Sequence, residues 1–306
     1  MNVEEIINLP VDFEGETLQL KNKAENELNE TEENIRNGLK VIKELVKEEG
    51  TITCFSDDFI LLFLRVNKFD FKKTFKRLKE YSHLRHQYMN YYGFMIPENI
   101  LPVFTGGICG ILPYRDNQGR AIIYFRANQI AYQLEAKMDT DDVLRAVQVL
   151  AHFVLMFPAT QISGFCIIAD MKVDSIDVLQ LVFKYVRYVL PTIHLFPARI
   201  QKVDCINTNV IVRTLINLVR PLIPNKIFKR TSFHGSDIQD LLKVYDASLL
   251  PEEFGGTLGP VKQLSEQYLP KFKEYIDVLQ ASNRYFTRKD TISYPLSNKE
   301  LCGFFK

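Results

Sequence analysis

The sequence has no tryptophan among its 306 residues, and several signals that would define a class of protein are absent as well. No apolar run approaches the roughly 18–20 residues that a helix needs to span a bilayer. The five cysteines are scattered, odd in number and without CxxC spacing, which argues against a disulfide framework. The first residues, MNVEEIINLPVDFEGE, lack the basic segment and apolar core of a signal peptide. We therefore expect a cytoplasmic protein with reduced thiols.

The sequence also lacks an excess of charge of either sign, because basic and acidic residues nearly balance and the net charge is only +1 at pH 7. A general nucleic-acid-binding protein would have a broad basic surface, so no nucleic-acid partner is expected. The composition is that of a globular chain, with 46% hydrophobic and 25% charged residues. At this length the chain can form one large domain or two smaller ones.

The residue patterns of common catalytic sites are missing too. The glycines of Gly106-Gly107-x-x-Gly110 lie inside an expected strand rather than in a phosphate-binding turn, and no GxSxG motif is present. His83 and His86 have helical spacing, but no second ligand pair follows, so a solvated helix face is the simpler interpretation. We predict no catalytic residue, no metal ligand and no cofactor, and therefore a protein that is not an enzyme.

The first third of the chain predicts helices. Residues 25–49 have helical periodicity and end before Gly50, residues 59–69 follow the cap Ser56-Asp57-Asp58, and residues 71–88 follow Asp70. Three helices with short connections suggest a small bundle that ends near Met95. The domains predicted from these patterns are an acidic extension (1–24), a helical domain (25–95), an α/β domain (96–258) and a C-terminal helix and tail (259–306).

After the bundle, the pattern changes to alternating strands and helices. Residues 103–128 predict two strands around a polar Asp-Asn-Gln-Gly turn, and a long helix covers residues 141–157. Strands at 164–170, 200–207 and 229–234 alternate with helices at 174–190 and near 210–223, and one further helix is expected at 261–285. This order predicts an α/β fold with a mainly parallel sheet flanked by helices.

Positive charge is concentrated between Phe196 and Gly235. Seven basic residues lie there against the single acid Asp204, and the helix within this segment has a broad apolar arc. The arc holds Val212, Leu215, Ile216, Leu218, Val219, Leu222 and Ile223, with Val210 outside it. Such a helix can cover an apolar ligand and face an anionic surface, or it can be an ordinary core helix beside solvated lysines. The pattern alone leaves both interpretations open.

Four segments, in this order along the chain, resemble the motifs of the CRAL-TRIO lipid-binding and lipid-transfer family. They are LLFLRVNKFDFKKTFKRLKEY, ISGFCIIADMKVDSID, the stretch from Ile200 to Gly235, and LLPEEFGG. The likeness is strongest to the branch that contains alpha-tocopherol transfer protein and retinaldehyde-binding protein. The resemblance implies a sheet with a gating helix over an apolar pocket, preceded by a small all-helical domain.

The resemblance also implies a set of ligand-binding residues and a basic patch for phosphoinositide membranes. The expected pocket residues are Leu144, Val147, Ala151, Phe165, Ile167, Ala169, Ile176, Phe196, Ile200, Val203, Val210, Thr214 and Leu218. The patch positions fall on Arg199, Lys226 and Arg230, while the fourth falls on Gln201, for which the neighbouring Lys202 is the expected substitute.

The function implied is that of a monomeric cytoplasmic carrier that associates transiently with membranes. It would bind one small lipophile, such as a tocopherol or retinoid, and exchange it at phosphoinositide-containing membranes. The alternative is a phosphatidylinositol or phospholipid transfer protein, or a lipid-sensing scaffold. Vesicle-to-vesicle transfer separates carriers from scaffolds.

Overall fold

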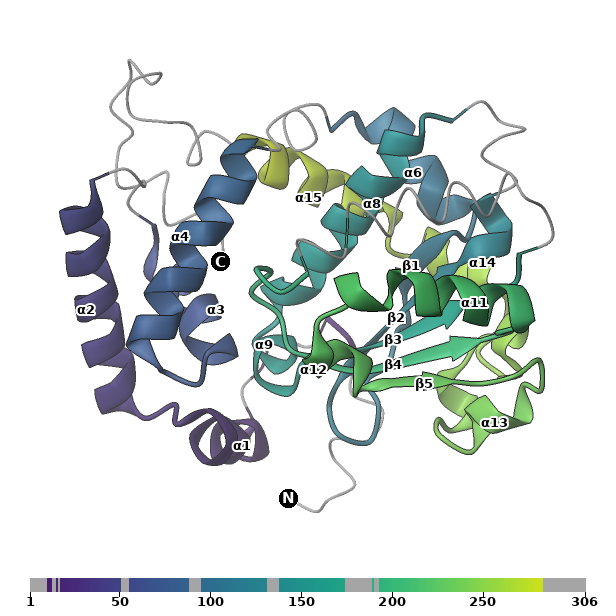
Figure 1. Ribbon diagram of the computed structural model, residues 1–306, viewed down its shortest axis with the longest axis horizontal. Coiled ribbons are helices and arrows are strands. Elements are labelled where there is room, and N and C mark those ends of the chain that lie inside the picture. The colour runs from purple at the N-terminus through teal and green to yellow at the C-terminus, as the bar shows by residue number, and fades with distance from the viewer. Residues whose placement is uncertain are drawn as a thin grey trace.

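The computed structural model describes residues 10–12, 15, 17–50, 55–87, 95–130, 138–173, 189 and 193–282. Figure 1 shows helices α2, α3 and α4 gathered at one side of a sheet, with further helices packed around that sheet. The predicted helix at 174–190 lies outside the described residues, apart from Val189. No helix in the described part of the chain is long and apolar enough to cross a membrane.

The sheet has five strands in the order β1-β2-β3-β4-β5. The strands are β1 (Cys109–Ile111), β2 (Ala121–Arg126), β3 (Phe165–Asp170), β4 (Ile200–Ile206) and β5 (Thr231–Phe233). Strand β1 pairs with β2 in antiparallel fashion, and every other pairing is parallel. The apolar sequence FCIIAD forms the central strand and is covered on both faces, as expected for a parallel sheet. The prediction of a mainly parallel α/β sheet is confirmed.

The hairpin between β1 and β2 is shorter than the sequence predicted. Residues 103–105 end helix α6 (Pro97–Thr105) instead of beginning a strand. Helix α6 starts at Pro97, whose missing N–H is no loss in a first helical turn. The predicted polar turn is present, because the Gly119 amide donates to the Asp116 carbonyl at 2.9 Å.

Two helices form where the sequence suggested one that starts at Glu25. They are α1 (Leu18–Leu28) and α2 (Glu32–Glu49), separated at Asn29, whose φ is 62°. Thr31 then caps α2 by accepting from the Asn34 amide at 3.1 Å. A left-handed Asn followed by a Thr cap is a local signal that outweighs continuous periodicity.

The next helices follow their predicted caps. They are α3 (Asp57–Val66), capped by Ser56, and α4 (Phe71–Gln87), which begins after Asp70. Farther along come α8 (Thr140–Phe153), α9 (Pro158–Ser163), α11 (Val210–Val219), α12 (Asn225–Phe228) and α13 (Gln239–Leu242). Asn209 caps α11 by accepting from the Val212 amide at 2.9 Å, which confirms the expected start of this helix.

The predicted single helix at 261–285 is also divided in two. Helix α14 (Val261–Glu266) is followed by α15 (Leu269–Ser282), with Pro270 in the first turn of the second helix. A proline is accepted there but not in a helix interior, so the chain restarts at this point.

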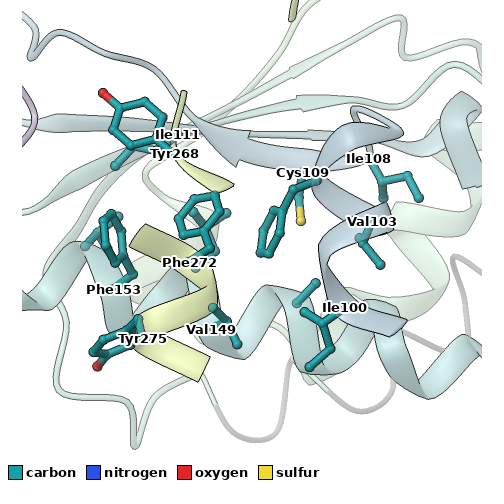
Figure 2. Packing of buried hydrophobic residues seen from close by; sticks show 14 of the residues in the cluster. Ile100, Val103, Ile108, Cys109, Ile111, Val149, Phe153, Tyr268, Phe272 and Tyr275 are labelled. Atoms are coloured by element: carbon teal, nitrogen blue, oxygen red, sulfur yellow. The ribbon is translucent and has the colours of Figure 1, made fainter. Parts of the chain in front are cut away.

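A large core lies between α6, α8, α15 and β1 (Figure 2). The Phe272 ring of α15 packs edge-on against Phe153 of α8, with centroids 5.0 Å apart, and lies 4.3 Å from Phe104 of α6. Burial of each such ring contributes about 2–3 kcal/mol. The C-terminal helix α15 is therefore part of the same core as the α/β domain.

Candidate functional site

One face of the sheet carries two rows of side chains. The register aligns Ile123, Ile167, Val203 and Thr231 in one row, and Phe125, Ala169, Cys205 and Phe233 in the next. Because side chains alternate along a strand, all of these point to the same face. A register shift beside Phe165 and Cys166 brings Ile200 and Val203 to this face although they are three residues apart.

This face of the sheet borders a cavity of about 350 Å³. Helix α8 lines it through Leu144, Val147 and Ala151, and the segment from α11 to α12 lines it through Ile216, Val219, Ile223 and Ile227. In Figure 1, α11 crosses in front of the strands, and its side chains Ile216 and Val219 lie on the cavity wall. A volume in this range is typical of sites for small organic ligands.

The wall is almost wholly apolar. Among the described residues, its polar side chains other than cysteine are those of Tyr81, Tyr124, Gln148 and Thr231, and the Tyr124 hydroxyl lies 2.8 Å from Ser265 Oγ. The Thr231 hydroxyl donates to the Ile227 carbonyl at 2.9 Å. Arg85 Nη1 donates to the Tyr81 hydroxyl at 3.1 Å, and His152 Nε2 lies 3.1 Å from the same oxygen. These polar groups are engaged by the protein, so the cavity suits a hydrophobic ligand.

The His152 ring is neutral in this setting. Burial, and then the positive charge of Arg85, lower its pKa well below the ordinary value. The ring also packs edge-on against Phe196 on the cavity wall, with centroids 4.8 Å apart. A neutral imidazole adds no charge beside the apolar wall.

Two cysteines, Cys109 and Cys205, also line the cavity. Burial raises the pKa of each thiol to about 12. Both thiols are therefore protonated at neutral pH and act as small apolar groups.

The structure places nine of the predicted pocket residues on the cavity wall. They are Leu144, Val147, Ala151, Phe165, Ile167, Ala169, Phe196, Ile200 and Val203. Ile176 lies outside the described residues. Whether these side chains contact a ligand stays a prediction.

Three predicted residues do not line the cavity. Val210, Thr214 and Leu218 lie on the outer side of α11, where Val210 is 81% and Leu218 67% exposed. The prediction that they close the pocket is wrong, because the helix turns Val212, Ile216 and Val219 inward at i, i+4 and i+7 spacing. Ile216 and Val219 belonged to the apolar arc seen in the sequence, so the signal for them was present.

Residues from β2 and β5 were missed altogether. Ile123 and Phe125, and Thr231 and Phe233, share the sheet face with the predicted β3 residues. Strand alternation would have identified them once the strand order was known. Tyr81 of α4 comes from a distant helix and had no signal in the sequence.

Beside the cavity lies a cluster of cations. Burial, followed by the charges of Arg230, Arg77, Arg199 and Lys68, lowers the pKa of Lys226. Burial and Arg199 likewise lower the pKa of Arg230, whose guanidinium donates to the Ile200 carbonyl. We call Lys68, Arg77, Arg199, Lys226 and Arg230 the basic cluster. Lys68 lies in the turn between α3 and α4 and Arg77 lies on α4, and neither was among the predicted patch residues.

Lys202, the expected substitute for the fourth patch position, does not belong to the basic cluster. Its ammonium group lies 3.1 Å from the fully buried Asp204 carboxylate and 5.6 Å from the centre of the Tyr245 ring. Asp204 also accepts from the Tyr245 hydroxyl at 2.8 Å and lies 2.9 Å from His234 Nε2. This pairing, on the sheet face opposite the cavity, argues against a membrane role for Lys202.

Comparison with known proteins agrees with this architecture. Residues 105–256 match the model of the CRAL/TRIO domain. The chain is 27% identical to human alpha-tocopherol transfer protein-like over 249 residues, which covers 79% of this chain and 71% of the relative. It is 29% identical to mouse clavesin-1 over 252 residues, covering 78% and 68%. The crystal structure of Sfh5 has the same fold, with a TM-score of 0.57 and 12% identity, and covers 80% of this chain and 96% of that one.

Proposed function

The chain belongs to the CRAL-TRIO family of lipid-binding and lipid-transfer proteins, and from this premise we propose that it is a non-enzymatic carrier of one small hydrophobic ligand. The ligand, a tocopherol, a retinoid or a similar lipophile, occupies the cavity beneath α11 and is exchanged at phosphoinositide-containing membranes. The observation that carries the proposal is the apolar cavity of about 350 Å³ between the sheet and α11.

The energetics of the cavity explain why exchange needs a membrane. Burial of a lipid with roughly sixteen methylene equivalents contributes about 13 kcal/mol before any cost of binding is subtracted. Spontaneous escape into water is therefore slow. Release requires that α11 move away from the sheet where the lipid and the inner side chains, such as Ile216 and Val219, meet an apolar phase.

The outer face of α11 supports contact with such a phase. Val210, Ile211 and Leu218 are exposed there, at 81%, 62% and 67%, and Leu222, in the turn that follows α11, is 51% exposed. Exposed apolar side chains gathered on one helical segment are typical of surfaces that insert into the membrane interface. Helix α11 thus has one apolar face for the ligand and another for the membrane.

The basic cluster supplies the attraction to an anionic surface. Lys226 is exposed on α12, directly after the segment that carries α11. Each basic residue near an anionic leaflet contributes about 1 kcal/mol. Four or five such residues hold the protein at the surface and favour the open position of α11 there.

The proposal is tested with purified protein loaded with fluorescent tocopherol or retinoid analogues. The expected results are saturable binding of one ligand per chain and transfer from donor to acceptor vesicles that accelerates when the acceptors contain phosphatidylinositol bisphosphate. Tight binding without transfer would favour the lipid-sensing scaffold. Binding of phosphatidylinositol or another phospholipid in place of these analogues would favour phospholipid transfer.

A further inference from the structure

Helix α1 is fixed against the α/β domain by a stripe of apolar residues. Leu20, Ala24 and Leu28 are buried and pack against Ala159 and Ile162 of α9. The spacing of four residues places them on one face of the helix. The stripe begins within the predicted acidic extension, so this part of the chain is docked to the domain.

The docked helix brings Glu27 to Arg199, one residue of the basic cluster. Arg199 Nη2 donates to Glu27 Oε2 at 2.9 Å, and its Nη1 donates to the carbonyl of Ile162. The Arg199 side chain is only 12% exposed, whereas that of Glu27 is 45% exposed. Lys23 Nζ lies 3.9 Å from the other Glu27 oxygen.

The charge of Arg199 reaches the rest of the basic cluster. It is among the causes that lower the pKa of both Lys226 and Arg230. A carboxylate paired with Arg199 therefore reduces the positive potential at the position where Lys226 and Arg230 meet an anionic group. A phosphorylated headgroup that approaches these residues competes with Glu27 for the Arg199 guanidinium, since both present oxygen acceptors to the same donors.

We infer that Glu27 acts as a built-in competitor for the phosphates of an anionic lipid headgroup and limits the affinity of this protein for phosphoinositide membranes. The inference rests on the proposed function, because it assigns the basic cluster to a membrane headgroup. Glu27 thus sets the affinity for the headgroup although it lies outside the basic cluster. When the headgroup binds, the Glu27–Arg199 ion pair must open, or the Arg199 guanidinium must donate to both acceptors.

The test uses flotation with phosphatidylcholine vesicles that either contain or lack phosphatidylinositol bisphosphate. Glu27→Gln should raise partitioning onto the phosphoinositide vesicles about fivefold at low salt, since an ion pair of this kind is worth up to about 1 kcal/mol. Glu25→Gln is the matched control, because Glu25 lies exposed on the same helix and the substitution changes the net charge equally. Equal effects of the two substitutions would overturn the inference.

A second pair of variants tests whether the gain depends on Arg199. Arg199→Gln in the Glu27→Gln background should abolish the increase, whereas Arg199→Gln alone should weaken binding by less than about twofold, because the charge is already paired. A gain that survives without Arg199 would contradict the mechanism. Thermal unfolding of each variant shows that the fold is retained.

The inference about Glu27 and the proposed carrier function can fail independently of each other. If labelled lipophiles bind and transfer but Glu27→Gln leaves vesicle binding unchanged, the inference fails and the carrier stands. If no lipophile binds but Glu27→Gln still raises partitioning through Arg199, the carrier fails and the inference stands. Soluble inositol trisphosphate is included as a competitor. If it binds Glu27→Gln as tightly as the vesicles do, a free phosphate rather than a membrane lipid is the ligand, which would overturn the membrane assignment.

Discussion

Three cysteine thiols on the sheet are buried away from water. Cys109 and Cys205 face the cavity and Cys166 faces the opposite core, and burial raises the pKa of each to about 12 from an ordinary value of about 9. The folded state therefore holds these protons more tightly than the unfolded chain does between pH 9 and 12. The stability contributed by the protonated thiols is present below about pH 9 and is lost as the pH rises toward 12.

This linkage predicts a pH profile. The free energy of unfolding should fall as pH increases above about 9, and replacing Cys205 with Ala should reduce that slope. In the native protein at pH 8, iodoacetamide should leave the three thiols unmodified, whereas denatured protein should react. Rapid alkylation of Cys166 or Cys205 in the folded state, measured by mass spectrometry of peptides, would contradict the buried, protonated assignment.

Ala151 gives a direct test of the cavity. A phenylalanine at this position on α8 adds a ring to the cavity wall, so Ala151→Phe should weaken lipophile binding at least about tenfold while costing about 1–3 kcal/mol of stability. The matched control is Thr214→Phe, which places the same ring on the exposed side of α11. Titration with a fluorescent lipophile measures both. Unchanged affinity in Ala151→Phe would mean that the ligand lies elsewhere.

Among the elements, α11 shows best how far the sequence could predict the site. The start of the helix near residue 210 followed from local residue types, and its position over the sheet was implied by the family resemblance. The inward face did not, because apolar residues occupy both sides, with Ile216 inward and Ile211 and Leu218 outward. Periodicity identifies a buried face only when the other face is polar.

The outer face of α11 makes a prediction of its own. Ile211→Asn with Leu218→Asn should slow transfer to vesicles at least about tenfold, because two exposed side chains can no longer enter the membrane interface. Ligand affinity in solution should stay the same, since neither residue lines the cavity. Val244→Asn, at another exposed apolar position, is the control. Transfer at the original rate would show that this face does not meet the membrane.

Other elements reveal the same limit of local patterns. The mainly parallel pairing of the strands followed from alternating strand and helix signals, whereas the β3 residues Phe165, Ile167 and Ala169 of the cavity wall were implied by the family resemblance. The contributions of β2 and β5 needed the register between strands, and that of Tyr81 needed the packing of α4 on the α/β domain. Long-range pairing of this kind is a tertiary property, so it could not be read from one segment.

On the scale of the whole molecule, the chain is almost neutral and its positive charge is concentrated locally. The net charge is +1, yet five cations gather beside the cavity. Lys68 lies in the turn between α3 and α4 and Arg77 lies on α4, whereas Arg199, Lys226 and Arg230 belong to the α/β domain. An anionic membrane that binds the cluster therefore contacts both parts of the molecule.

Charge reversal at the cluster tests this arrangement. Lys226→Glu with Arg230→Glu should slow transfer to phosphoinositide vesicles at least about tenfold and remove most of its salt dependence, with ligand affinity unchanged. Lys262→Glu with Lys273→Glu makes the same change of charge on the exposed faces of α14 and α15 and should have little effect. If the substitutions reduced ligand affinity and transfer equally, the basic cluster would have no separate role in the exchange step.

The most direct test of the central claim is native mass spectrometry of the protein purified from its natural source, followed by organic extraction of whatever it holds. The carrier proposal predicts one lipophile per chain, absent from Ala151→Phe expressed and purified in the same way. An empty yet stable protein, or a lipid retained equally by Ala151→Phe, would show that the space beneath α11 is not a ligand site.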